Sequence, residues 1–107
     1  MATSYLVLGQ AASTTSAASL YTAAAQTVVS TITACNVTSS AATATINIGK
    51  SGAAAATSNA VVYQYTVPAY TTATWTLGIT MASTDILYVS SGTSGALTFQ
   101  AFGSTIV

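Results

Sequence analysis

Very few side chains in this sequence could carry out chemistry, and they occur singly rather than in sets. The 107 residues include one Lys, one Asp, one Cys and no His or Glu. Acid–base and nucleophilic catalysis need a positioned acid, base or activated nucleophile, and glycoside hydrolysis needs a pair of carboxylates. We therefore predict no catalytic residues and no enzymatic activity.

The charged residues do not form a binding site either. Lys50 and Ser51 are adjacent in a small-residue segment, where a Ser–Lys pair rarely faces one another, so we expect Lys50 to be an exposed loop charge. Cys35 and Asp85 together are too few ligands to enclose zinc or calcium. No glycine-rich phosphate loop is present. The sequence predicts no metal and no cofactor.

Cys35 is the only cysteine, so no intramolecular disulfide is expected, and it is interpreted as a small buried hydrophobic residue. Residues 36–38 match a glycosylation sequon. The N-terminal residues MATSYLVLGQAAS lack the basic region of a signal peptide, which favours a chance match. No apolar run approaches the roughly 18 residues that a membrane helix needs.

The aromatic residues suggest a possible binding surface. Tyr63, Tyr65, Tyr70 and Tyr88 with Trp75 could stack on sugars or bases. Stacking platforms for nucleic acid come with positive charge, which is missing here. A carbohydrate-binding module remains an alternative, whereas core and subunit-interface positions are the favoured interpretation.

The near absence of charge is the strongest functional signal. Charged residues make up 2% of the chain, against roughly 25% in typical globular domains. A net charge near zero promotes association, and a single basic side chain offers nothing to nucleic acid or to an anionic membrane. We expect the partners to be further copies of this chain and other components of one assembly, with no nucleic acid and no membrane.

Residues 26–36, QTVVSTITACN, predict a central strand, because β-branched residues dominate it and Gly and Pro are absent. At a period of two, Val28, Ser30, Ile32 and Ala34 share a largely apolar face, which we expect to enter the core. The following alternation over 43–48 predicts a partner strand. The two strands are expected to form a hairpin.

Turn signals at regular intervals predict further short strands, at 5–8, 20–22, 60–67, 72–77, 86–90 and 96–102. Residues 10–19 and 49–59 are expected to be loops, and 103–107 a tail. Residues 1–107 then form a single domain, an all-β antiparallel sandwich of seven or eight strands. Its topology is expected to be jelly-roll-like or an immunoglobulin-like Greek key.

The N-terminal residues 1–9 are predicted to be an arm or edge strand, and their apolar residues are the candidate assembly contacts: Tyr5, Leu6, Val7 and Leu8. Eight larger residues are the candidate core: Val28, Ile32, Ile46, Tyr63, Trp75, Leu77, Ile86 and Phe99.

A set of short motifs, taken in order, resembles a group of small structural proteins of tailed bacteriophages, common among phages of cyanobacteria and aquatic bacteria. The matching stretches are residues 20–22 (LYT), 26–36 (QTVVSTITACN, with its VVSTITACN), 67–69 (VPA), 77–82 (LGITMA), 84–85 (TD) and 102–104 (FGS). The resemblance covers nearly the whole chain. It implies a non-catalytic virion component assembled in the host cytoplasm, with capsid decoration preferred and contact with the major capsid protein expected.

The chain departs from that family in its charge. Members carry basic residues near the segment that corresponds to 49–60 and an acidic residue close to the C-terminus, whereas these regions here read GKSGAAAATSNA and GSTIV. This difference keeps two alternatives open, a self-assembling tube or extracellular filament subunit and a tail, neck or fibre module.

Overall fold

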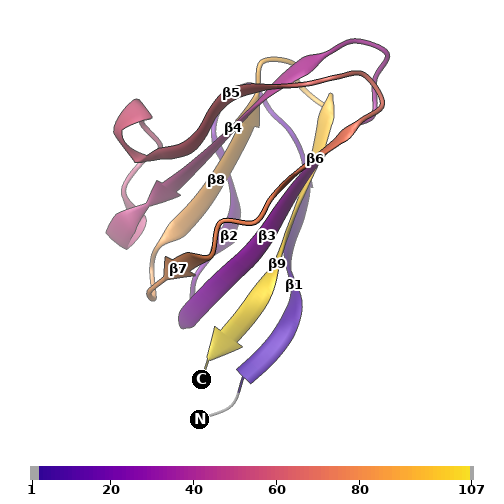
Figure 1. Cartoon of the computed structure of the whole chain (residues 1–107). Helices are drawn as coiled ribbons and strands as arrows, with labels where there is room; N and C mark the ends of the chain where they lie inside the picture. Colours follow the sequence, from indigo (N-terminus) through magenta and orange to yellow (C-terminus); the bar gives the residue numbers. More distant parts are fainter. Residues whose placement is uncertain (1–2, 107) are drawn as a thin grey trace.

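The chain folds into two antiparallel β-sheets packed face to face (Figure 1), as a computed structural model of residues 3–106 describes. The nine strands among these residues are β1 (Thr3–Ala12), β2 (Ala18–Thr22), β3 (Gln26–Asn36), β4 (Ala42–Gly49), β5 (Ala60–Val67), β6 (Thr72–Trp75), β7 (Ile79–Met81), β8 (Ile86–Ser91) and β9 (Leu97–Ile106). One sheet has the order β1-β9-β3-β6, with β7 also paired to β3, and the other has the order β2-β8-β4-β5. The predicted all-β sandwich is confirmed.

The strand pairs are nested along the chain. The first strand pairs with the last, β2 with β8, β3 with both β6 and β7, and β4 with β5. The chain is thus one long antiparallel ribbon whose tip is the β4–β5 loop. Rolling up that ribbon adds the β3–β9 and β4–β8 pairs that close the two sheets. This is the arrangement of a jelly roll, one of the two predicted topologies.

The ribbon tip contains two short 3₁₀ turns, η1 (Lys50–Gly52) and η2 (Thr57–Asn59). The buried Asn47 of β4 anchors the tip, because its amide nitrogen donates to the Ala56 carbonyl at 2.9 Å and to Asn59 Oδ1 at 3.1 Å. Tyr88 of β8 donates its hydroxyl hydrogen to the Ala53 carbonyl at 2.9 Å. Side chains therefore satisfy backbone groups that a loop of small residues would leave unpaired.

The set of β3 residues predicted to face the core is correct only for the second half of the strand. Opposite β9, Val29 lies across from Gly103 and Thr31 from Phe102, so Ser30 is an extra, bulged residue. A bulge reverses the inward and outward alternation. Ile32 and Ala34 are buried as expected, whereas Val29 replaces Val28 in the core. The prediction of Val28 as a core residue is therefore wrong, and its side chain lies on the outer side of the sheet.

The predicted hairpin of residues 26–37 and 43–48 is also wrong. β3 and β4 lie in different sheets, and residues 37–41 cross between them. The buried Asn36 holds this crossing: its Nδ2 donates to the carbonyls of Ser40 (2.9 Å) and Val67 (3.0 Å), and its Oδ1 accepts from Thr38 N (2.9 Å) and Oγ1 (2.8 Å). One side chain thus replaces the ladder bonds that a hairpin would supply.

Several element boundaries differ from the predictions. The expected loop 10–19 is strand at both ends, because β1 continues to Ala12 and β2 begins at Ala18. The expected tail is strand as far as Ile106, and residue 107 lies outside the described range. The strand predicted over 72–77 ends at Trp75, and residues 79–81 form the separate β7.

Of the eight candidate core residues, Ile32, Ile46 and Phe99 are fully buried, and Trp75 is half-buried against the core. Three further predictions are wrong, those for Tyr63, Leu77 and Ile86. Tyr63 is exposed because the bulge at Gln64, with φ of 50°, reverses the faces of β5. Leu77 is exposed in the break between β6 and β7.

Ile86 is only half-buried, because the alternation of β8 turns Leu87 and Val89 inward instead.

Two phenylalanines of β9 allow a matched test of the core. Phe99 is fully buried and Phe102 lies on the outer face, half-buried. We expect Phe99→Ala to lower the free energy of unfolding by about 3–5 kcal/mol, because it leaves a cavity. Phe102→Ala is expected to cost about 1 kcal/mol or less. Urea denaturation followed by Trp75 fluorescence measures both, and equal losses would contradict this assignment of faces.

Candidate assembly surface

The four candidate contact residues lie together on β1, at the edge of the larger sheet (Figure 1). Among the described residues, β1 pairs only with β9. The outer edge of this strand therefore presents unpaired backbone N–H and C=O groups. The structure places residues 3–9 in an edge strand of the sheet rather than in a detached arm, while residues 1 and 2 lie outside the described range.

Pairing with β9 decides where each contact residue points, because directly opposite residues of an antiparallel pair share a face. Tyr5 lies opposite Ser104 and Val7 opposite Phe102, on the outer face. Leu6 lies opposite Gly103 on the inner face. Even so, the exposed fractions of these side chains are 85% for Tyr5, 44% for Leu6 and 46% for Val7.

Leu8 differs from its neighbours. It is the bulged residue of β1, since Val7 lies opposite Phe102 and Gly9 opposite Ala101. Its side chain packs against the core. Gly9 follows where β1 approaches β2, and a Cβ built on it would lie 2.3 Å from the Leu20 carbonyl oxygen. The exposed candidate contact residues are therefore Tyr5, Leu6 and Val7, whereas Leu8 packs into the fold.

An apolar depression adjoins these residues on the outer face. It has a volume of about 620 Å³ and extends from β1 over β9 to β3. Its lining includes Val28, Phe102 and Ser104 besides the three contact residues. Sequence reasoning missed Val28 as a surface residue. The signal for Phe102 was present, because alternation places it opposite the face of Phe99. Tyr5, Val7, Val28 and Phe102 present their side chains on this face, whereas Leu6 borders the depression with its side chain on the inner face.

A second group of aromatic residues lies on the edge strands β5 and β6 and in the turn between them. Tyr65 of β5 meets Trp75 of β6 edge to face, with ring centroids 5.6 Å apart and planes at 84°. This contact joins the two sheets where their edge strands come together. Tyr63 and Tyr70 are exposed near it in sequence, but no ring contact between them is present in the described residues.

Two further features of the sequence, the lone cysteine and the glycosylation sequon, involve residues that are partly or fully buried in the fold. Cys35 is half-buried, on the side of β3 opposite the core residue Ala34. Asn36 of the sequon is buried with both amide hydrogens donated to carbonyls. A glycan on that nitrogen would break the crossing between the sheets, so the folded chain does not present this sequon for glycosylation.

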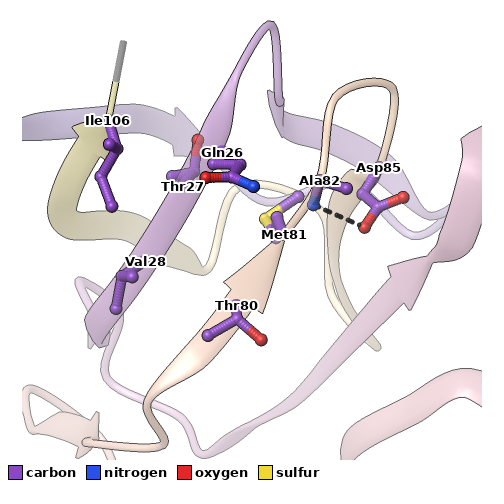
Figure 2. Close-up of a pocket in the computed structure, with 8 residues that line it drawn as sticks. All are labelled: Gln26, Thr27, Val28, Thr80, Met81, Ala82, Asp85 and Ile106. Carbon is purple, nitrogen blue, oxygen red and sulfur yellow. Dashed lines mark hydrogen bonds between the residues drawn. The ribbon is translucent and has the colours of Figure 1, made fainter. Parts of the chain in front are cut away.

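The only two charged side chains of the sequence lie close to the ribbon tip. The Asp85 carboxylate accepts the backbone N–H of Ser51 at 2.8 Å. It also accepts that of Ala82 at 3.0 Å, the bond drawn in Figure 2. These hydrogen bonds, with a smaller contribution from Lys50, hold the pKa of Asp85 below its ordinary value of 3.8. Ser51 has a φ of 56°, in the left-handed region, and the hydrogen bond that its N–H donates to Asp85 helps to hold it in that conformation.

Asp85 also borders a depression of about 430 Å³, which Figure 2 shows lined by residues of the paired strands β3 and β7. Met81 and Thr27 form its buried floor, and Ile106 lies across from Asp85. The carboxylate is already engaged by two backbone donors. The carboxylate is therefore not free to bind a small ligand, and the other polar side chains of the lining include the exposed Gln26 and Thr80.

Within residues 3–106, no three metal-ligating side chains of the His, Cys, Asp or Glu type come together. In the same range, neither 3₁₀ turn nor any other helix has the length and apolar character for crossing a membrane. No protein-family model, curated protein or solved structure matches the chain. Any functional conclusion therefore depends on the geometry described above.

The low pKa of Asp85 predicts an acid-dependent stability. A carboxyl with a depressed folded pKa stabilises the fold above its ordinary pKa, and this contribution is lost as pH falls through the folded value. We expect Asp85→Asn to lower the melting temperature at pH 7, and the difference from the wild type to shrink as pH falls below about 4. Thermal melts from pH 7 to pH 2 measure this.

Lys50→Gln is the matched control, since Lys50 contributes least to the shift and its loss should leave the pH profile nearly unchanged. A difference between Asp85→Asn and wild type that stays constant down to pH 2 would contradict the role of the ionised carboxylate.

Proposed function

We propose that this chain is a non-catalytic structural subunit of a virion, which stabilises the capsid of a tailed phage as a decoration protein through lateral contacts. One observation carries the proposal: an open, apolar sheet edge lies on a surface that has almost no charge. Tyr5, Leu6 and Val7 are exposed beside a row of unpaired backbone groups. A free monomer gains nothing from this arrangement, whereas a neighbouring subunit can cover it.

The chemistry of the surface suits lateral packing. Only Lys50 and Asp85 carry side-chain charge, and Asp85 is committed to the backbone of the ribbon tip. Contacts between such surfaces rest on apolar burial and backbone hydrogen bonds, neither of which depends on opposite charges. The jelly roll adds support by analogy alone, since viral capsid proteins are among the proteins that use it.

A self-assembling filament subunit is the second candidate. It requires two distinct contact surfaces on each copy, because head-to-tail contacts generate open polymers. The exposed Val61 and Tyr63 of β5, in the other sheet, could supply the second surface. A tail, neck or fibre module would use the same surfaces and differs only in its place in the particle.

Carbohydrate binding is the least favoured alternative. Stacking on a sugar requires exposed ring faces that lie parallel to it. Tyr65 and Trp75 are nearly perpendicular and already pack on each other. No charged side chain lies on β5 or β6 to bind hydroxyl groups beside them.

The proposal is tested by electron microscopy of the purified chain, alone and mixed with empty phage heads. We expect small oligomers alone and regular binding to the head lattice when heads are added. Long tubes formed by the chain alone would support the filament subunit instead of the decoration protein. A chain that binds no head and forms no assembly would overturn the structural role.

The neutral surface makes a second prediction about these contacts. Because charged groups are nearly absent, raising the salt from about 0.05 M to 0.5 M should not weaken assembly, although this change strongly screens electrostatic attraction. Sedimentation of the assembled material at both salt concentrations measures this. A steep loss of assembly at high salt would show that charges on the partner, not apolar contacts, hold the complex.

A further inference from the structure

The four sheet edges of the sandwich differ in how readily they can accept another strand. The β6–β7 edge is broken at residues 76–78, with Gly78 at a φ of 62°. The β5 edge carries two register shifts and the left-handed Gln64. β2 has five residues and a shift between Ser19 and Tyr21. Breaks, bulges and short strands are the devices that protect an edge from pairing.

The edge of β1 has none of these devices over residues 3–7. Its pairing with β9 is in continuous register from Thr3 to Val7, and the bulge comes only at Leu8. No Pro or charged residue lies in β1. The structure thus leaves one sheet edge open while interrupting the other three, and the open edge is the one that bears the exposed apolar residues.

We propose that the occupant of this edge is a second copy of the same chain. Residues 4–8 of two β1 strands pair antiparallel about a two-fold axis at Leu6, which joins the two larger sheets into one. This inference rests on the proposed structural role and names the partner of its contact surface. It would also account for the exposure of Leu6 on the inner face, since the partner's Leu6 covers it.

The choice of a second copy follows from self-complementarity. Antiparallel pairing about an axis perpendicular to the sheet keeps the outer faces of both copies on the same side. In the register centred on Leu6, Tyr5 lies opposite the partner's Val7 and Val7 opposite the partner's Tyr5. Aromatic and β-branched residues form favourable cross-strand pairs. A register centred on Tyr5 would instead set Leu6 against the partner's Ser4 and Val7 against the partner's Thr3, so that neither would meet an apolar residue.

Charge supports the same occupant. A two-fold axis brings the residues close to it near their own copies, so a charged side chain at the centre of this edge would face a like charge. The neutral β1 strand is free of that repulsion. A foreign strand with charged residues would find no opposite charge to pair with here.

Cysteine cross-linking tests the register directly. In a Cys35→Ser background, Leu6→Cys should form a covalent dimer on mild oxidation. Residues directly opposite in an antiparallel pair have Cα atoms about 4.5–5.5 Å apart, within the range that a disulfide spans. Val61→Cys is the matched control, because Val61 is an exposed edge-strand residue with the same exposed fraction as Val7, 46%. It should remain monomeric on a denaturing gel.

A second experiment tests the pairing across the axis. Tyr5→Cys and Val7→Cys chains, mixed, should give several-fold more covalent dimer than either chain alone. Separately, Val7→Lys should abolish the dimer in light scattering, whereas Val61→Lys should keep it. Both lysine variants should retain the wild-type melting temperature at concentrations where the protein is monomeric, because both positions are exposed.

The outcomes separate this inference from the proposed function. Cross-linking of Leu6→Cys no greater than that of Val61→Cys, or a dimer that survives Val7→Lys, would overturn the β1 pairing. If such a protein still decorates phage heads, the structural role stands and a different surface makes the contact. A β1 dimer that binds no head and forms no larger assembly would support the pairing and overturn the virion role.

Discussion

The pairing of β3 with β9 is the interaction on which the rest of the structure depends. Both strands are long, and their ladder lies in the middle of the larger sheet. The bulge at Ser30 divides it into two parts with opposite consequences. Beyond the bulge, Ile32 and the residues that follow fill the core. Before it, Val29 turns inward and Val28 turns outward, beside Phe102. One inserted residue therefore sets both the composition of the core and the apolar depression next to β1. Gly103 is required at this point, since a Cβ there would lie 1.9 Å from the Val28 carbonyl oxygen.

A chain of small, neutral residues cannot use ion pairs to hold its turns and crossings in place. Much of it comes from side-chain amides and hydroxyls that bond to the backbone where the chain changes direction. Asn36 secures the crossing between sheets, Asn47 the ribbon tip, and Ser13 accepts the N–H of Leu97 at 3.1 Å near the start of β9. Among the described residues, no buried side-chain nitrogen or oxygen lacks a partner. Since an unpaired buried polar group costs roughly 1–3 kcal/mol, such complete pairing is a condition for this fold.

Most of the strands could be predicted from the sequence, because period-two alternation and turn residues act locally. The errors fall where a local pattern meets a non-local constraint. The bulges at Ser30 and Gln64 reversed the faces of Val28 and Tyr63, and nothing in the adjacent residues marks either position.

The hairpin error has a different origin: a five-residue connection fits a hairpin and a crossing between sheets equally well. Only the burial of Asn36 distinguishes them, and burial is a property of the folded chain. The edge position of residues 5–8 could be predicted because a short apolar run that ends at a glycine near the N-terminus is a local signal, and their role as assembly contacts stays a prediction.

The jelly-roll topology makes β1 one of four edge strands, and the irregularities of the other three leave β1 as the open one. In the nested ribbon β1 pairs with β9, its one neighbour among the described residues. The β4–β5 end of the ribbon is closed by its own loop and blunted by bulges. β1 thus keeps an open edge, and the sequence places neither Lys nor Pro in this strand. In most proteins an edge like this would be a hazard, because it templates pairing with other chains. In the proposed structural role, the same edge would give association a direction and a register, which apolar contacts alone do not supply.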